Sequence, residues 1–250
     1  MINIYYNSKE IITFDIETSS LSAPEGEFVC SCVAKMGVNK LSEECYFIEV
    51  QRSLRELNNY FHKLKKQDND YLIVTWNGEN YKTSFDFPWL RTQFALNDLY
   101  WGFEEFQHLD FYPLTKRYFN NKFIKKEPAS VSSLYKNDLE KLAVANGLGY
   151  TTKKETYKSI KELENPEWLN YIKEKREDRF DEQSVYQTFC DPEGYEDYID
   201  GSEVIELYKE GEIDKIIKHN RQDVRRLYDL VNLLLDYIPE YEIQRNINTL

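Results

Sequence analysis

The sequence is poor in the residues that mark fibrous, linker-like, disulfide-stabilised and membrane-spanning proteins. Its 250 residues include only 9 glycines, 7 prolines and 4 cysteines. So few glycines and prolines exclude a collagen-like or linker-like chain, and cysteines this sparse do not make a disulfide framework. No apolar run approaches the roughly 20 residues of a membrane span, and the first residues lack the pattern of a signal peptide. We therefore expect a cytoplasmic protein.

Basic residues are also in the minority. The chain has 32 Lys and Arg against 44 Asp and Glu, a formal net charge of -12. This charge argues against a protein that coats nucleic acid nonspecifically. It does not exclude an enzyme that holds metal ions in a carboxylate cluster and acts on nucleic acid. With 41% hydrophobic and 15% aromatic residues, the chain can bury a sizeable core.

The hydrophobic pattern predicts strands first and then strands that alternate with helices. Apolar, aromatic and β-branched runs predict strands at 11–16, 28–36, 44–50, 71–76 and within 103–112. Apolar residues at steps of three and four predict helices, and capping residues help to bound them, at 53–66, 88–96, 132–146, 165–176, 203–208 and 212–237. This order predicts an α/β fold, with one mixed β-sheet flanked by α-helices. We expect a single domain over residues 1–250, with a charged, tyrosine-rich helical insertion at about 150–200.

Two acids stand close together at the end of the first predicted strand. Asp15 and Glu17 are two residues apart, so their side chains point to the same side of the strand. Adjacent carboxylates repel each other and are costly to bury without a partner. A divalent cation removes that conflict, and oxygen ligands suit Mg²⁺ or Mn²⁺. The alternative is a solvated strand end, because this acid spacing is common.

Two later motifs carry further candidate groups, each with two interpretations. Asp86 stands among large apolar residues where a helix is expected to begin, and taken alone it is better explained as a helix N-cap. His219 and Asp223 are four residues apart and therefore lie on one face of a helix. They form either a surface pair or a general base beside a metal-binding carboxylate.

In this order, the three motifs together resemble those of the DEDD superfamily of 3'-to-5' exonucleases, which have the ribonuclease-H-like fold. Residues 15–21, Asp-Ile-Glu-Thr-Ser-Ser-Leu, look like the first exonuclease motif of that superfamily. Residues 200–224, which end in His-Asn-Arg-Gln-Asp-Val, are similar to the YprB-like branch. One departure concerns Asn77-Gly78. Six residues separate this pair from Phe85, whereas such a pair stands close before the second motif in that branch.

The resemblance implies a chemistry and a set of site residues. By it, two divalent cations, Mg²⁺ or Mn²⁺, would be held by Asp15, Glu17, Asp86 and Asp223. His219 would accept the proton of the attacking water, and nucleoside 5'-monophosphates would leave from a 3' end. The candidates for contact with the substrate follow the first motif, surround the second or precede Asp223: Thr18, Ser19, Leu21, Asn77, Tyr81, Trp89 and Arg221.

The resemblance therefore implies a metal-dependent exonuclease, with single-stranded DNA as the expected substrate. Trimming of RNA 3' ends is the nearest alternative, because the sequence does not indicate how the sugar is distinguished. A noncatalytic nucleic-acid-binding or scaffold module that retains the fold is the other alternative. The insertion at about 150–200 is a candidate surface for a protein partner.

Overall fold

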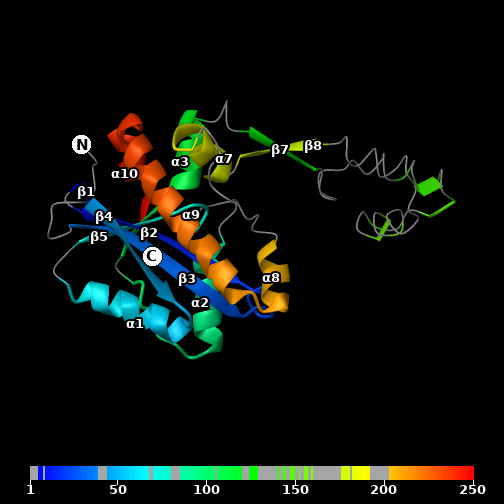
Figure 1. Ribbon diagram of the computed structural model, residues 1–250, viewed down its shortest axis with the longest axis horizontal. Helices are drawn as coiled ribbons and strands as arrows, with labels where there is room; N and C mark the ends of the chain where they lie inside the picture. The colour runs from blue at the N-terminus through cyan, green and yellow to red at the C-terminus, as the bar shows by residue number, and fades with distance from the viewer. Residues whose placement is uncertain are drawn as a thin grey trace. The chain divides into compact units, whose positions relative to one another are not determined.

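The computed structural model describes two compact units, Met1–Asn120 with Glu182–Leu250, and Asn121–Asp181 (Figure 1). The described residues are 5–7, 9–38, 44–67, 70–79, 85–104, 106–119, 124–128, 140, 143–144, 147–149, 152, 155–156, 159, 176–180, 182–191 and 203–250. Within them, no helix combines the length and the apolar character that crossing a membrane requires.

The first unit is built on a seven-stranded mixed sheet in the order β4-β3-β2-β5-β6-β9, with β1 paired to β2 outside this path. Strands β2, β3 and β4 are antiparallel neighbours, whereas β5 and β6 run parallel to β2. Helices flank this sheet, so the α/β fold class predicted from the sequence is confirmed, and the arrangement is consistent with a ribonuclease-H-like fold. The strands are β1 (Tyr5–Tyr6), β2 (Lys9–Thr18), β3 (Phe28–Val38), β4 (Glu44–Gln51), β5 (Tyr71–Thr75), β6 (Gln107–Asp110) and β9 (Ile247–Thr249).

The pleat of β2 sorts its side chains between the two faces of the sheet. Ile12, Phe14 and Ile16 belong to an apolar core shared with α1 (Leu54–Lys65) and α2 (Asp86–Leu96). The alternate residues of β2 point to the other face of the sheet, which is covered by helix α9 (Ile213–Leu234). Thr13 shows this orientation, since its Oγ1 donates a hydrogen bond to the Val224 carbonyl at 2.6 Å. Figure 1 shows α9, in orange, crossing the blue strands. Asp15 and Glu17 therefore lie on the α9 side.

Local sequence features explain where α1 begins and which face of α9 is buried. The N-cap of α1 is Ser53, whose Oγ accepts a hydrogen bond from the Glu56 amide at 3.2 Å. The predicted apolar stripe of α9 is buried, and its residues are Ile216, Val224, Leu227, Leu230, Val231 and Leu234. A 3-10 turn, Leu235–Tyr237, continues this helix to the end predicted at Tyr237. Helix α8 (Val204–Glu210) precedes it and ends at Gly211, which has a φ of 78°.

Several short elements were not predicted from the sequence. Helix α3 (Phe111–Phe119) begins directly where β6 ends, α7 (Glu182–Phe189) precedes α8, and α10 (Glu240–Asn246) follows Pro239. Proline ends one helix but its fixed φ also suits the start of another, which explains why α10 was missed. Strand β9 has only three residues and pairs with β6 at the edge of the sheet, so no periodicity indicates it.

The second unit contains an antiparallel pair, β7 (Ile124–Pro128) and β8 (Arg176–Phe180). Arg176 belongs to this strand pair, although the helix predicted over 165–176 was expected to reach it. The rest of that predicted helix lies outside the described residues, as does most of the helix predicted at 132–146. The insertion expected at about 150–200 overlaps the second unit only in part and stays a prediction.

Replacing Phe61 by alanine is expected to destabilise the first unit strongly. Phe61 is fully buried, and its ring centroid lies 5.7 Å from that of Phe14 and 4.2 Å from that of Phe103. The cavity left behind should lower the free energy of unfolding by about 3–5 kcal/mol. Exposed Leu96 provides a matched control, since Leu96→Ala should cost at most about 0.5 kcal/mol. Urea denaturation followed by tryptophan fluorescence measures both, and equal effects would contradict the described core.

Candidate metal centre

Residues from each of the three sequence motifs line one cavity of about 320 Å³. The walls come from the end of β2, the segment after β5, the start of α2, and the helices α8 and α9. The lining residues are Asp15, Ile16, Glu17, Thr18, Leu21, Trp76, Asn77, Phe85, Asp86, Val204, Ile205, His219 and Asp223. All five residues expected to carry the chemistry are among them, although they are up to 208 positions apart in the chain (Asp15 to Asp223).

Asp15 and Glu17 enter the cavity from β2, as the alternation of strand side chains requires. Burial raises the pKa of Asp15 well above its usual range, and the nearby carboxylates of Asp86 and Glu17 raise it further. Burial also raises the pKa of Glu17, and the nearby Asp223 carboxylate raises it further, whereas a hydrogen bond from Asn220 lowers it. The Asn220 side chain also donates to Oδ2 of Asp15, at 2.6 Å. One amide therefore holds the first two acids of the cluster.

Asp86 is not the N-cap that its isolated motif favoured. It is the first residue of α2, and the cap position belongs to Phe85, which makes no side-chain capping bond. The Asp86 side chain is buried, at 4% exposure, and its Oδ2 has no hydrogen-bond partner among the described residues. Burial, followed by the charge of Asp110, raises the pKa of Asp86 well above its usual range. An acid in this setting requires either a proton or a cation.

Asn77-Gly78 lies beside the start of α2 despite the six residues that separate it from Phe85 in sequence. The Phe85 amide donates to the Asn77 carbonyl at 3.1 Å, and the Phe87 amide donates to the Gly78 carbonyl at 3.2 Å. Any Cβ at Gly78 would overlap the Thr75 side chain, so only glycine allows this close approach. The longer loop therefore leaves Asn77 in the wall of the cavity.

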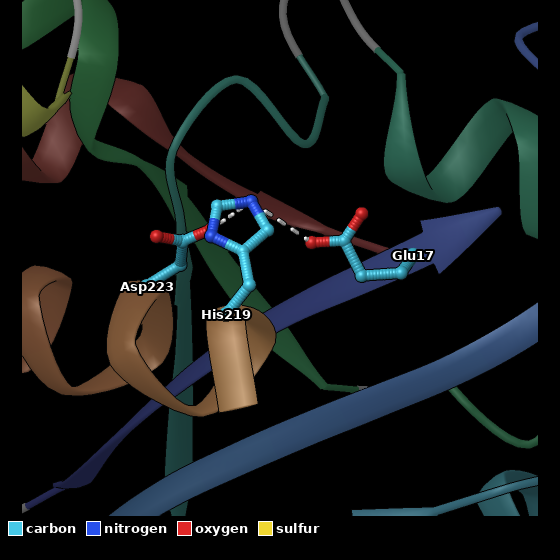
Figure 2. Close-up of side chains that lie close together, drawn as sticks. All are labelled: Glu17, His219 and Asp223. Carbon is cyan, nitrogen blue, oxygen red and sulfur yellow. Dashed lines mark ion pairs between the residues drawn. The ribbon is translucent and has the colours of Figure 1, made fainter. Parts of the chain in front are cut away.

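His219 and Asp223 project from successive turns of α9 toward Glu17 (Figure 2). The Nε2 atom of His219 lies 3.2 Å from Oδ2 of Asp223 and 3.5 Å from Oε1 of Glu17. The His219 side chain is only 4% exposed, so the alternative of a surface pair is wrong. Burial raises the pKa of Asp223, while His219 and the fully buried Arg226 lower it. Arg226 donates to Oδ1 of Asp223 at 2.7 Å, which leaves Oδ2 facing the histidine.

This donor set fits a divalent cation. One donor atom each from Glu17, His219 and Asp223 lie within 4.8 Å of one another, so this cluster could bind a metal. Asp86 adds a buried oxygen without a hydrogen bond among the described residues, and Asp15 adds a further carboxylate in the same wall. Carboxylate oxygens are the ligands that Mg²⁺ and Mn²⁺ prefer. A cation would offset the burial that raises the pKa of each acid and the repulsion that raises the pKa of Asp15 and Glu17 further.

Some of the residues predicted to contact the substrate line the cavity, and others lie outside it. Thr18, Leu21 and Asn77 line the cavity, and the side chain of Leu21 is 76% exposed there. Ser19 lies just outside the lining, where its Oγ accepts a hydrogen bond from the Glu27 amide at 2.8 Å. Arg221 is exposed on α9 and is not part of the lining.

Two aromatic residues were also expected to contact the substrate, Trp89 and Tyr81. Trp89 is 3% exposed within the core, and its indole Nε1 donates to the Ser20 carbonyl at 3.2 Å. A ring buried in this way offers no free face to a nucleic-acid base, so the expected contact of Trp89 with the substrate is corrected to a packing role in the core. Tyr81 lies outside the described residues.

Two residues of the site, Asn220 and Arg226, were not singled out from the sequence. Both are fully buried on α9, where they hold Asp15 and Asp223 by hydrogen bonds. The sequence does contain a pattern that could have indicated them. Polar residues stand at positions 219, 220, 223 and 226, on the same face of the helix as its apolar residues. A buried polar side chain on a core-facing stripe needs a partner, and the predicted metal-binding acids were the available partners.

Comparison with known proteins adds little to these observations. No protein-family model and no curated protein matches the chain. Among solved structures, the chain is similar to a family B DNA polymerase from the hyperthermophilic archaeon Pyrobaculum calidifontis, with 15% sequence identity and a TM-score of 0.44. The similarity covers 90% of this chain and 24% of the polymerase chain, so this chain spans about a quarter of that length.

Asp86→Asn is expected to stabilise the metal-free protein at neutral and higher pH. The pKa of Asp86 is raised by burial, so this carboxyl destabilises the fold increasingly as the pH rises above its unfolded-state pKa, and the cost is complete above the folded-state pKa. The gain in melting temperature should be present in EDTA at pH 8 and should vanish as the pH falls toward about 4, where the unfolded carboxyl titrates. Each 1 kcal/mol corresponds to roughly 2–4 °C.

The matched control is Asp214→Asn, because the Asp214 side chain is 98% exposed. It should leave the melting temperature almost unchanged. A destabilised Asp86→Asn protein in EDTA at pH 8 would show that the Asp86 carboxylate has a favourable partner and is not in conflict with its surroundings.

Proposed function

We propose that the protein is a metal-dependent 3'-to-5' exonuclease that hydrolyses single-stranded DNA to nucleoside 5'-monophosphates. The observation that carries the proposal is the meeting of Asp15, Glu17, Asp86, His219 and Asp223 at one cavity. These residues come from three motifs that resemble those of the DEDD exonucleases, with the YprB-like branch as the nearest pattern. A solvated strand end, a helix cap and a surface ion pair would have no reason to converge in this way.

The four acids would hold two divalent cations, which would supply an activated water and neutralise the charge that develops on the leaving 3'-oxygen. The chain itself supplies the proton acceptor and the alignment. His219 lines the same cavity as the four acids and would accept the proton of the attacking water. Asn220 and Arg226 each hold one oxygen of a ligand acid, which fixes the direction of the remaining oxygen.

The rest of the cavity supports a site for the terminal nucleotide. A volume of about 320 Å³ falls within the range of small-molecule sites, at its lower end. Exposed Leu21 and the wall residues Thr18 and Asn77 would contact the terminal sugar and base. Arg221, exposed on α9, and Ser19 would meet the strand further from the scissile bond. Tyr81 stays a candidate for contact with the substrate, to which its ring could stack a base. The net charge of -12 means that metal ions must offset repulsion of the phosphodiester.

Cleavage of a 5'-labelled single-stranded DNA is the direct test. With Mg²⁺ or Mn²⁺, the wild type should give a ladder that shortens from the 3' end, whereas Asp15→Asn, Glu17→Gln and excess EDTA should each reduce cleavage to background. An RNA of the same sequence, run beside it, decides the sugar preference. Asp214→Asn serves as the exposed-acid control and should cleave as the wild type does. Full cleavage in excess EDTA would refute the metal-dependent mechanism.

Loss of the His219 base should slow cleavage without abolishing metal binding. His219→Ala is expected to lower kcat by about 10²–10⁴-fold, and imidazole added to the buffer should restore part of the rate by occupying the vacated space. His62→Ala is the control, because His62 lies on α1 with its ring stacked on Tyr100. Unchanged kcat in His219→Ala would remove this histidine from the mechanism.

Failure to cleave either oligonucleotide would favour a binding module that retains the fold. Such a module should bind single-stranded nucleic acid without any dependence on Asp15. A partner that docks on residues 150–200 would then be the next ligand to seek, using the full chain and a variant lacking that segment.

A further inference from the structure

We infer that His219, Glu17 and Asp223 form a transition-metal site, selective for ions such as Zn²⁺ and Co²⁺ over Mg²⁺, whose occupation blocks the proposed nuclease reaction. The inference deepens the proposed function, because it assigns a second role to the same histidine. Its metal-binding part stands on the geometry alone, and only its inhibitory part rests on the proposed reaction.

Two of the three distances between the donor atoms match the edge of a small coordination polyhedron. Metal–ligand bonds of about 2.0–2.2 Å in a tetrahedral site place neighbouring donor atoms about 3.4 Å apart. Nε2 of His219 lies 3.2 Å from Oδ2 of Asp223 and 3.5 Å from Oε1 of Glu17. The third separation is no larger than 4.8 Å. Figure 2 shows the two carboxylates converging on the imidazole ring from β2 and from α9.

A second observation separates this arrangement from an ordinary ion pair. A protonated His219 between two carboxylates would account for the same two distances. It would not account for Asp86, which lines the same cavity at 4% exposure with an Oδ2 that lacks a hydrogen-bond partner among the described residues. A proton on the histidine leaves this buried oxygen without a partner, whereas a cation in the cavity would supply one.

The donor atoms determine which metal ion binds with higher affinity. Imidazole nitrogen suits Zn²⁺, Co²⁺ and other transition metals, whereas Mg²⁺ prefers oxygen and retains its waters. His219 therefore adds affinity for transition metals but almost none for Mg²⁺. Arg226 occupies Oδ1 of Asp223, so Oδ2, the oxygen that faces His219, is the one left to bind a metal.

The consequence for the proposed reaction follows from the lone pair on Nε2. A nitrogen that binds a metal ion cannot accept a proton at the same time. Zn²⁺ bound through His219 should therefore inhibit cleavage that Mg²⁺ supports, and Mg²⁺ in excess should relieve the inhibition only by competing for the carboxylates.

The test measures metal binding first and activity second. Zn²⁺ affinity is measured by competition against Co²⁺, whose visible spectrum distinguishes a nitrogen-containing site from an all-oxygen site, and Mg²⁺ affinity is measured by calorimetry. His219→Gln should weaken Zn²⁺ by at least about tenfold, since even the loss of an outer-shell partner costs 10–100-fold. It should leave Mg²⁺ affinity unchanged. His62→Gln is the matched control and should alter neither.

A second measurement needs no substitution in the site. The chain contains only 3 histidines, so imidazole nitrogen resonances can be assigned and followed in the intact protein. Zn²⁺ should shift the Nε2 resonance of one histidine, the one whose signal is lost in His219→Gln, and Mg²⁺ should not. Equal Zn²⁺ affinity in wild type and His219→Gln, or no imidazole response to Zn²⁺, would overturn the inference.

The outcomes also separate this inference from the proposed function. Zn²⁺ binding that depends on His219, in a protein that cleaves no oligonucleotide with Mg²⁺ or Mn²⁺, would uphold the transition-metal site and remove the exonuclease. Metal-dependent cleavage that Zn²⁺ does not inhibit, with Zn²⁺ affinity independent of His219, would uphold the exonuclease and remove the transition-metal site.

Discussion

Electrostatic repulsion among buried acids is the constraint on which the rest of this structure depends. Asp15, Glu17, Asp86 and Asp223 share one small cavity, and burial raises the pKa of each. A fold gains no stability from such an arrangement when no cation is bound. The acids therefore form a cluster that could bind a metal, and hydrogen bonds from Asn220 and Arg226 hold Asp15 and Asp223 in position.

The two faces of β2 have different roles in holding these acids. Ile12, Phe14 and Ile16 anchor the apolar core under α1 and α2, and Phe14 stacks there on Phe87 with ring centroids 5.6 Å apart. The odd-numbered residues face α9, where Asp15 meets the amide of Asn220. Because α2 begins with Asp86 and continues directly into Phe87, the same helix joins core and cavity. A well-packed core on one face thus offsets the cost of the charged cluster on the other.

Features set by residues close together in the sequence could be predicted, whereas contacts between segments far apart in the sequence could not. The strands, the main helices and the pairing of Asp15 with Glu17 on one face followed from local periodicity. The meeting of Asp86 with these acids followed only from the family resemblance, since no local pattern fixes a contact between β2 and α2. The burial of Trp89 and the hydrogen bond of Asn220 to Asp15 were missed because both are set by packing between distant segments. Short edge elements such as β9 were missed because three residues carry no periodicity.

The central claim is that divalent cations resolve the conflict among these acids. Crystals of the protein grown near neutral pH and soaked in Mn²⁺ would test it most directly, by anomalous diffraction at an energy where manganese scatters strongly. The account predicts anomalous density in the cavity, within coordination distance of Asp15 and at least one of Glu17, Asp86 and Asp223. A cavity without such density at millimolar Mn²⁺, with the acids hydrogen-bonded to one another through shared protons, would contradict it.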